Sequence, residues 1–222
     1  MRQSLVPSMS GEEIVTLLDK LYPKIKNPLG HDGAFQLLIA TILSAQCTDA
    51  QVNRVTPHLF RRFPDANSMA RANLRELERL VKSTGFFHVK ARRIKEVSKR
   101  IVNDFDGKVP QSMNELTTLS GVGRKTANIV LSAGFGKTEG IAVDTHVQRL
   151  SKRIGLSQEK NPEKIEQDLM KITPKELWPR LSLLLILHGR KICNAREPLC
   201  EKCVLTSKCN YFRNTIDSIQ LH

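Results

Sequence analysis

The sequence has no apolar run long enough to cross a bilayer, and its first residues lack the apolar core of a secretory signal. The longest uninterrupted apolar stretch, residues 183–187, is far short of the roughly 20 residues that span a membrane. We therefore expect a cytoplasmic protein with no membrane partner. A length of 222 residues, with 40% hydrophobic and 26% charged residues, also excludes collagen-like, mucin-like and wholly disordered chains.

Acidic residues are too few to balance the basic ones. The chain has 22 Asp and Glu against 35 Lys and Arg, which gives a formal net charge of +13. Most of the excess lies in two segments, 82–100 and 190–213. A solvated helix face explains one such run, but two clustered runs are typical of binding to a phosphate backbone.

Alternation of apolar and polar residues over the length of a strand is absent, as are internal repeats and low-complexity linkers. Apolar residues instead recur at helical spacing, as in Val52, Val55, Leu59 and Phe63. Asn161 followed by Pro162 predicts a helix start, and Gly85 predicts a helix end. These patterns predict an all-α fold in which any division into domains is discontinuous or lies at the cysteine-rich end.

The cysteines do not form a disulfide framework, because their number is odd and four of the five crowd into the last thirty residues. These four have the spacing C-x6-C-x2-C-x5-C and are Cys193, Cys200, Cys203 and Cys209. Four thiolates from one short segment can hold a zinc ion or a cubane iron–sulfur cluster, and the spacing leaves both open. Cys47 stands apart in an apolar stretch and is predicted to be a small core residue.

A Walker-type phosphate loop is absent, because the G-x4-G-K-[ST] spacing does not occur and no strand precedes the glycines. Residues 119–127, Leu-Ser-Gly-Val-Gly-Arg-Lys-Thr-Ala, lie instead between two helical patterns. Two glycines before a helix start let backbone N–H groups approach a phosphate, as in a helix–hairpin–helix motif. A plain glycine turn between helices is the alternative.

Lys125 follows these glycines and is a candidate nucleophile or a phosphate-binding lysine. A lysine amine attacks only when neutral, a state that desolvation or the neighbouring Arg124 would favour. Asp144 is the carboxylate that could serve it, and it is also a good N-cap for the helix carrying Val147. Both roles of Asp144 are compatible, because a carboxylate held by backbone donors stays ionised and can stabilise a developing cation.

Together these segments resemble the endonuclease III family of helix–hairpin–helix DNA glycosylases. The resemblance runs from about Glu12 to Tyr211, in order and with the family's spacing. It is carried by the hairpin at 119–126, Val-Asp-Thr-His at 143–146, Leu-His-Gly-Arg at 187–190, the four-cysteine tail, Leu-Ser-Ala-Gln at 43–46 with Thr-Asp at 48–49, and Gly-Phe-Phe-His-Val-Lys-Ala at 85–91.

The resemblance implies two helical domains that flank a DNA-binding cleft. One is a six-helix barrel over residues 27–137 that contains the helix–hairpin–helix. The other is a cluster domain built from residues 1–26 and 138–222, with a [4Fe-4S] cluster on the four tail cysteines. A monomer that works in the nucleoid is expected, because the surfaces that face DNA must stay free.

The implied activity is base excision repair of double-stranded DNA that carries a damaged base or an abasic site. A bifunctional enzyme would remove oxidised pyrimidines and then cleave the strand by β-elimination, with Lys125 as nucleophile and Asp144 as the catalytic aspartate. Gln46 would fill the gap left by the flipped base, and Phe86 would wedge the opposite strand. The full set of expected DNA-binding residues is Gln46, Asp49, Phe86, Phe87, His88, Lys90, Gly121, Gly123, Arg124, Thr126, His146 and Arg190.

Two other functions stay open at this point. A monofunctional adenine or mismatch glycosylase of the same superfamily is disfavoured by Lys125 and by the absence of a further domain after Tyr211. A non-catalytic DNA-binding module could combine the hairpin with a zinc site. Ser120, where many relatives have proline, and Cys47 beside Gln46 depart from the family pattern and bear on lesion preference.

Overall fold

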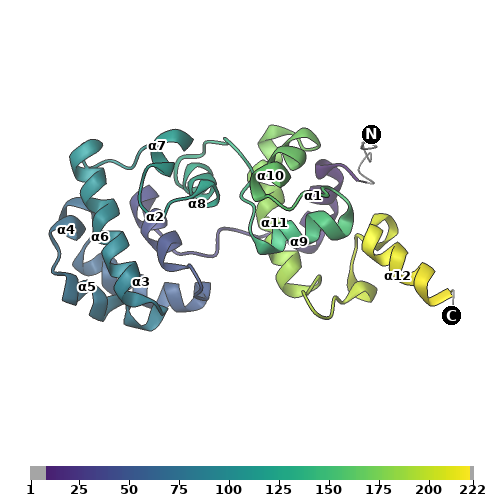
Figure 1. Cartoon of the computed structure of the whole chain (residues 1–222), viewed down its shortest axis with the longest axis horizontal. Coiled ribbons are helices and arrows are strands. Elements are labelled where there is room, and N and C mark those ends of the chain that lie inside the picture. Colours follow the sequence, from purple (N-terminus) through teal and green to yellow (C-terminus); the bar gives the residue numbers. More distant parts are fainter. Residues whose placement is uncertain (1–8, 221–222) are drawn as a thin grey trace. The chain divides into compact units, whose positions relative to one another are not determined.

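The computed structural model describes residues 9–220, and every regular element in that range is a helix. The prediction of an all-α fold is confirmed. The chain divides into two compact units, which we call the middle unit (Asn27–Glu139) and the terminal unit (Met1–Lys26 with Gly140–His222). The terminal unit is therefore discontinuous in sequence (Figure 1). No helix within residues 9–220 is both long and apolar enough to cross a membrane.

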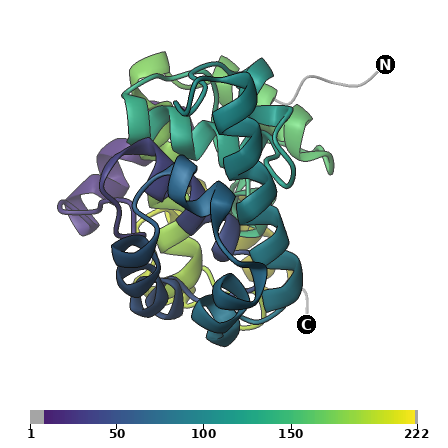
Figure 2. The ribbon, with the colours of Figure 1, turned by 90° about the vertical axis from the view of Figure 1, so that its left-hand side faces the viewer.

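The middle unit is built around one buried helix. Its helices are α2 (Gly33–Leu43), α3 (Asp49–Arg62), α4 (Ala66–Arg71), α5 (Leu74–Val81), α6 (Phe87–Asp104), α7 (Met113–Thr117) and α8 (Arg124–Ile129), with a 3₁₀ turn at Lys82–Thr84 and a π-helical turn at Val130–Gly134. Residues 37–43 of α2 are all buried, and α3, α6 and α8 pack against this helix. Figure 2 turns the middle unit toward the viewer.

Polar side chains cap several helices of the middle unit, among them α3 and α4. Thr48 Oγ1 accepts the N–H of Gln51 (3.2 Å) at the start of α3, and Asp65 Oδ1 accepts the N–H of Ser68 (2.8 Å) at the start of α4. Each bond satisfies an amide that has no partner inside its own helix. The caps therefore set where α3 and α4 begin, and the apolar stripe behind each cap packs into the core.

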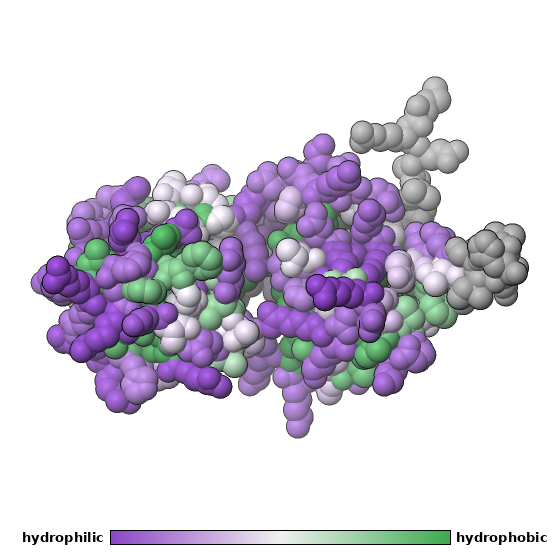
Figure 3. All heavy atoms as spheres, turned by 60° about the horizontal axis from the view of Figure 1, so that its bottom comes forward, coloured by the Kyte–Doolittle hydropathy of each residue, from purple (hydrophilic) through white to green (hydrophobic). Residues whose placement is uncertain are grey.

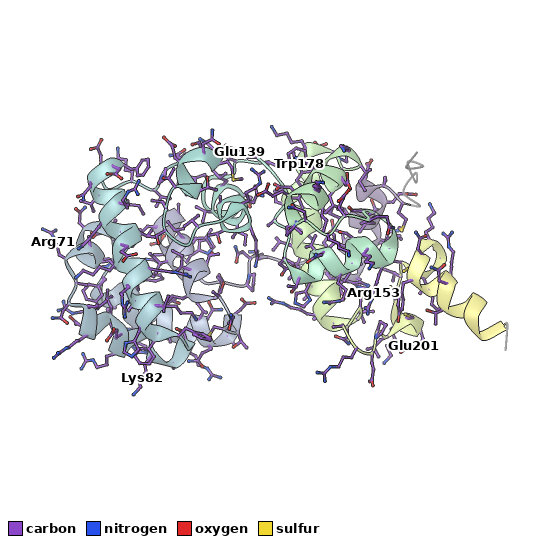
Figure 4. The ribbon with its side chains drawn as sticks, viewed as in Figure 1. Arg71, Lys82, Glu139, Arg153, Trp178 and Glu201 are labelled. Carbon is purple, nitrogen blue, oxygen red and sulfur yellow. The ribbon has the colours of Figure 1, made fainter. Side chains whose placement is uncertain are left out.

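The terminal unit joins the N-terminal helix to the second half of the chain. Its helices are α1 (Gly11–Leu21), α9 (Thr145–Ile154), α10 (Pro162–Lys171), α11 (Trp178–Lys191) and α12 (Asn210–Gln220), with 3₁₀ turns at Lys175–Leu177, Cys200–Lys202 and Thr206–Lys208. Helix α1 packs against α11. Arg180 of α11 forms an ion pair with Asp19 of α1 and donates to the carbonyl of Ile25 (2.8 Å). Trp178, at the start of α11 (Figure 4), donates from Nε1 to the carbonyl of Thr173 (2.9 Å).

Most apolar side chains of the described residues are buried in the cores of the two units. The face in Figure 3 is accordingly mainly hydrophilic, with small hydrophobic areas. Among the large hydrophobic residues that are exposed, Phe86 has the highest exposed fraction, 64%. A phenyl ring left in solvent needs a functional explanation more than an aliphatic side chain at the edge of the core does.

Candidate functional site

The glycine hairpin lies between α7 and α8 in the middle unit. Leu119 and Val122 are buried and anchor it, and the N–H of Val122 donates to the carbonyl of Leu119 (3.0 Å). Gly121 has φ +76°, and a Cβ at this residue would lie 3.1 Å from Cδ of Arg93. The positive φ favours glycine here, and a Cβ would also require the Arg93 side chain to shift by a few tenths of an ångström.

Gly123 is the N-cap of α8, so the first N–H groups of this helix follow directly from the hairpin. Gly121 and Gly123 are exposed, and Arg124 and Thr126 are half-buried. Backbone amides at such a turn are suited to binding a phosphate. The sequence places Arg93 in the basic segment 82–100, but its contact with the hairpin was not predicted, because Arg93 lies on α6 and reaches the hairpin only through the tertiary fold.

Lys125 is the second residue of α8, and its side chain is exposed. Its amine is thus presented in the first turn of a helix, next to the hairpin. A lysine in a nucleophilic role acts through its neutral amine.

Asp144 lies in the terminal unit and is half-buried at the start of α9. Its Oδ1 accepts the N–H groups of His146 (2.8 Å) and Val147 (2.9 Å). The N-cap reading of the sequence is therefore correct. Both bonds go to Oδ1, so the second oxygen, Oδ2, is left for another group. Lys125 and Asp144 belong to different units.

The turn after α2 presents Gln46 in a strained backbone conformation. Gln46 is exposed and has φ +52°, which is rare for a residue other than glycine. Cys47 follows it, is partly buried and packs against the core of the middle unit. Asp49, half-buried, then begins α3. The turn therefore holds a polar side chain out toward solvent on a fixed backbone.

A second strained turn precedes α6. Gly85 has φ +70° and Phe86 has φ +48°, and the ring of Phe86 is largely in solvent. The ring of Phe87 stacks at 4.0 Å on that of His88, and Nδ1 of His88 lies 2.8 Å from Oε1 of Glu78. Positive φ at an exposed aromatic residue is costly and is typical of functional turns.

Lys90 differs from the other residues expected to contact DNA. Only 3% of its surface is exposed, and its Nζ donates to the carbonyl of Thr84 (2.6 Å). Burial lowers the pKa of this ammonium below its ordinary value, an effect partly offset by Cys47. The ammonium therefore faces the interior, and direct contact with a DNA phosphate is not available to it in this structure. Sequence reasoning placed Lys90 on the surface because a basic run gives no sign of which side chains turn inward.

Helices α9 and α11 cross closely at Gly189 in the terminal unit. A Cβ on Gly189 would lie 3.0 Å from Cβ of His146. His146 is half-buried, and burial lowers its pKa, with Arg149 and Arg190 adding to the effect and Asp144 opposing it. The two expected DNA contacts, His146 and Arg190, are therefore within electrostatic reach of one another and of Asp144.

Two arginines of α9 hold the segment that leads into the cysteines. Nη2 of Arg149 donates to the carbonyls of Gly189 (2.9 Å) and Cys193 (3.0 Å). Arg153, labelled in Figure 4, donates to the carbonyl of Asn194 (2.5 Å) and to Sγ of Cys193 (3.3 Å). Sequence reasoning missed both arginines, although their spacing of four residues places them on one face of α9.

The four tail cysteines are all half-buried and lie around the two 3₁₀ turns after α11. Burial, together with the other three cysteines, raises the pKa of the Cys203 thiol to about 11, while the hydrogen bond from the N–H of Leu205 opposes the rise. Burial also raises the pKa of Cys200, with contributions from Cys193 and Cys209. The four thiols are therefore within electrostatic reach of one another. Within residues 9–220 no three His, Cys, Asp or Glu side chains converge as ligands of a single ion.

Cys203 also receives hydrogen bonds from its surroundings. Nε2 of His188 lies 3.3 Å from its Sγ, and the N–H of Leu205 donates to it (3.4 Å). His188 is 1% exposed, and its Nδ1 lies 3.1 Å from the hydroxyl of Tyr22 near the end of α1. A hydrogen bond donated to the sulfur stabilises its thiolate form, which is the form in which a cysteine binds a metal. The donor set thus fits a thiolate-ligated metal group.

The comparisons with known proteins agree with these features. Residues 39–175 match the model for the HhH-GPD superfamily base excision DNA repair proteins. The chain is 50% identical to endonuclease III of Synechocystis sp., over 94% of this chain and 95% of the relative, and 44% identical to endonuclease III of Bacillus subtilis, over 89% and 92%. A solved structure of a trapped endonuclease III–DNA covalent intermediate superimposes with a TM-score of 0.87 at 39% identity, covering 94% of this chain and 99% of that one.

Proposed function

Because the chain belongs to the HhH-GPD superfamily of base excision DNA repair proteins, and within it to the endonuclease III family, we propose that it excises oxidised pyrimidines from duplex DNA and cleaves the strand at the resulting abasic site. Membership of this family makes the protein a base excision DNA glycosylase rather than a non-catalytic binding module. The observation that carries the bifunctional assignment is Lys125, an exposed amine in the first turn of α8.

The first step releases the base. The target nucleotide is extruded from the duplex, because its C1′ cannot be reached in the stack. The neutral amine of Lys125 attacks C1′, and the glycosidic bond breaks with its electron pair leaving on the base, which takes up a proton. The carboxylate of Asp144, fixed by its N-cap bonds, stabilises the positive charge that develops on the sugar.

The second step cleaves the strand. Cleavage of the bond between C1′ and the ring oxygen converts the adduct to a protonated imine on Lys125. Removal of a proton from C2′ then expels the 3′ phosphate by β-elimination. Water hydrolyses the unsaturated imine and returns the free amine. A monofunctional glycosylase lacks the amine that forms this imine, so Lys125 favours the bifunctional mechanism.

The remaining residues would hold the DNA. Exposed hairpin amides and Arg124 would bind a backbone phosphate, and His146 and Arg190 would contribute from the terminal unit. Gln46 would occupy the gap left by the extruded nucleotide, and Phe86 would wedge the opposite strand. Asp49, Phe87, His88 and Thr126 would support these contacts from the same turns. We further propose that the protein acts as a monomer on the DNA of the nucleoid, in the cytoplasm.

Borohydride trapping on an abasic duplex tests the role of Lys125. Borohydride reduces the imine to a stable amine, so the wild type is expected to form a covalent protein–DNA adduct. Lys125→Gln removes the nucleophile and should give no adduct while it still binds DNA. Lys164→Gln is a matched control, because it removes an exposed lysine on α10, outside both basic segments, and it should form the adduct like the wild type. An equal yield of adduct from Lys125→Gln would refute the assignment.

We also propose that Cys193, Cys200, Cys203 and Cys209 hold a [4Fe-4S] cluster. The four-cysteine spacing and the donors on Cys203 support a thiolate-ligated metal group, and membership of the endonuclease III family favours the cluster over zinc. When bound, the cluster would crosslink the segment that carries the basic residues after Arg190. The middle unit would then be the six-helix barrel and the terminal unit the cluster domain.

The colour and metal content of the purified protein test this cofactor. A brown preparation with broad visible absorption, and about four irons per chain, is the expected result. Cys203→Ser should remove the colour, whereas Cys47→Ser should keep it, because Cys47 lies in the core of the middle unit. A colourless protein with one zinc per chain would contradict the proposal.

A further inference from the structure

Lys90 is a buried ammonium without a carboxylate bonded to it among the described residues. It lies in the first turns of α6 and is 3% exposed, and its Nζ donates to the carbonyl of Thr84. Burying an ammonium costs free energy unless the location gains something from it. An apolar residue could fill the same space without this cost, so the buried amine of Lys90 needs a structural reason.

The two bonds of Lys90 bracket the strained turn. Its side-chain Nζ donates to the carbonyl of Thr84 (2.6 Å), and its backbone N–H donates to the carbonyl of Phe86 (3.0 Å). Gly85 and Phe86, both with positive φ, lie between these two carbonyls. The backbone bond is the ordinary first bond of α6, so the bond that the Lys90 side chain adds is the one to the carbonyl of Thr84, directly before the turn that presents the exposed phenyl ring.

The same ammonium also lies close to the turn after α2. Cys47 is within electrostatic reach of Lys90, and it directly follows Gln46, the other exposed residue with positive φ. A second tie connects the two turns, because Nε2 of Gln51 donates to Oγ of Ser83 (2.8 Å). Lys90 is therefore bonded to one strained turn and lies within electrostatic reach of the residue that follows Gln46 in the other.

We propose that Lys90 is a positioning residue that holds Phe86 in register with Gln46, so that both side chains enter the duplex together when a nucleotide is extruded. This inference rests on the proposed function. Lys90 does not contact DNA in this role. Two side chains that enter a base stack should be held rigidly beforehand, because ordering them on binding would cost free energy. A fixed main-chain clip provides that rigidity.

Lys90→Met tests the clip, because methionine fills the space but leaves the Thr84 carbonyl without its donor. We expect faster hydrogen exchange at the amides of Gly85 and Phe86, about tenfold or more. Lys95→Met is a matched control. Lys95 is on the same helix and also donates from Nζ to a carbonyl, that of Ala72 (2.6 Å), away from both turns. It should leave exchange at the turn unchanged.

The activity readout separates positioning from general damage to the fold. Single-turnover base release by Lys90→Met should fall about tenfold on a lesion in a paired duplex, and much less on the same lesion in single-stranded DNA, where no stack has to be entered. Lys95→Met should keep the wild-type ratio of the two rates. Lys90→Arg retains a donor for the Thr84 carbonyl and should restore part of the loss.

A double variant tests whether Lys90 acts through Phe86. If Lys90 acts through Phe86, then Lys90→Met should cost little further activity in a Phe86→Ala background. Equal loss on paired and single-stranded substrates, or full additivity with Phe86→Ala, would overturn the inference. A wild type that binds DNA but releases no base would refute the proposed function instead, and hydrogen exchange at Gly85 and Phe86 would still decide whether the clip exists.

Discussion

The carboxylate of Asp144 has two roles, as the N-cap of α9 and as a fixed negative charge. It accepts two backbone N–H groups through Oδ1, which starts α9, and it holds a fixed negative charge near His146. Asparagine caps a helix about as well as aspartate but carries no charge. Asp144→Asn should therefore keep the thermal stability of the protein and its affinity for DNA, while base release slows by roughly 10²–10³-fold. Single-turnover kinetics and a binding titration measure the two effects.

Two controls separate the charge of Asp144 from its cap. Asp144→Ala removes both and should also cost about 1 kcal/mol of stability. Asp65→Asn makes the same exchange at the cap of α4, where Oδ1 accepts the N–H of Ser68 (2.8 Å), and should leave base release unchanged. If Asp144→Asn retains the wild-type rate, the carboxylate is only a cap and its catalytic assignment is wrong.

At the scale of elements, the sequence predicted the helix ends that depend on residues close together in the chain. Asn161 caps α10 with Pro162 in its first turn, and Gly85 ends the 3₁₀ turn, both as the sequence indicates. The burial of Lys90 and the contact of Arg93 with Gly121 were not predictable. They depend on which face of α6 meets α2 and on where the hairpin packs, and a single sequence does not encode these tertiary contacts in any short pattern.

The residues of the candidate site also divide into those that the sequence reveals and those that only the fold reveals. The hairpin glycines, Lys125 and the four cysteines stand out because their spacing is itself chemical information. The arginines of α9 and the pair of Tyr22 and His188 do not, because their partners are more than 35 residues away in the chain. Helix α9 shows the result: its first residue is fixed by a cap visible in the sequence, while its grip on the cysteine segment is visible only in the fold.

At the scale of the whole molecule, the formal net charge of +13 could act in two ways. It could attract DNA as one diffuse field, or separate residues could neutralise separate phosphates. Arg93 lies beside the hairpin. Arg196 is exposed and directly follows Ala195, whose carbonyl accepts a hydrogen bond from Arg153. Lys164, exposed on α10, lies outside both basic segments. Substitution of any one of these three by glutamine changes the net charge by the same amount.

Binding of an abasic duplex across a series of salt concentrations distinguishes the two models. Each phosphate contact contributes about 0.9 to the slope of log affinity against log salt. Arg93→Gln and Arg196→Gln should therefore each lower the slope by about one, and Lys164→Gln should leave it unchanged. Equal slopes for all three variants would mean that the charge acts as a diffuse field, and the two basic segments would lose their assignment as the DNA-binding surface. The local model is favoured because Arg93 packs against the one glycine of the hairpin that has positive φ.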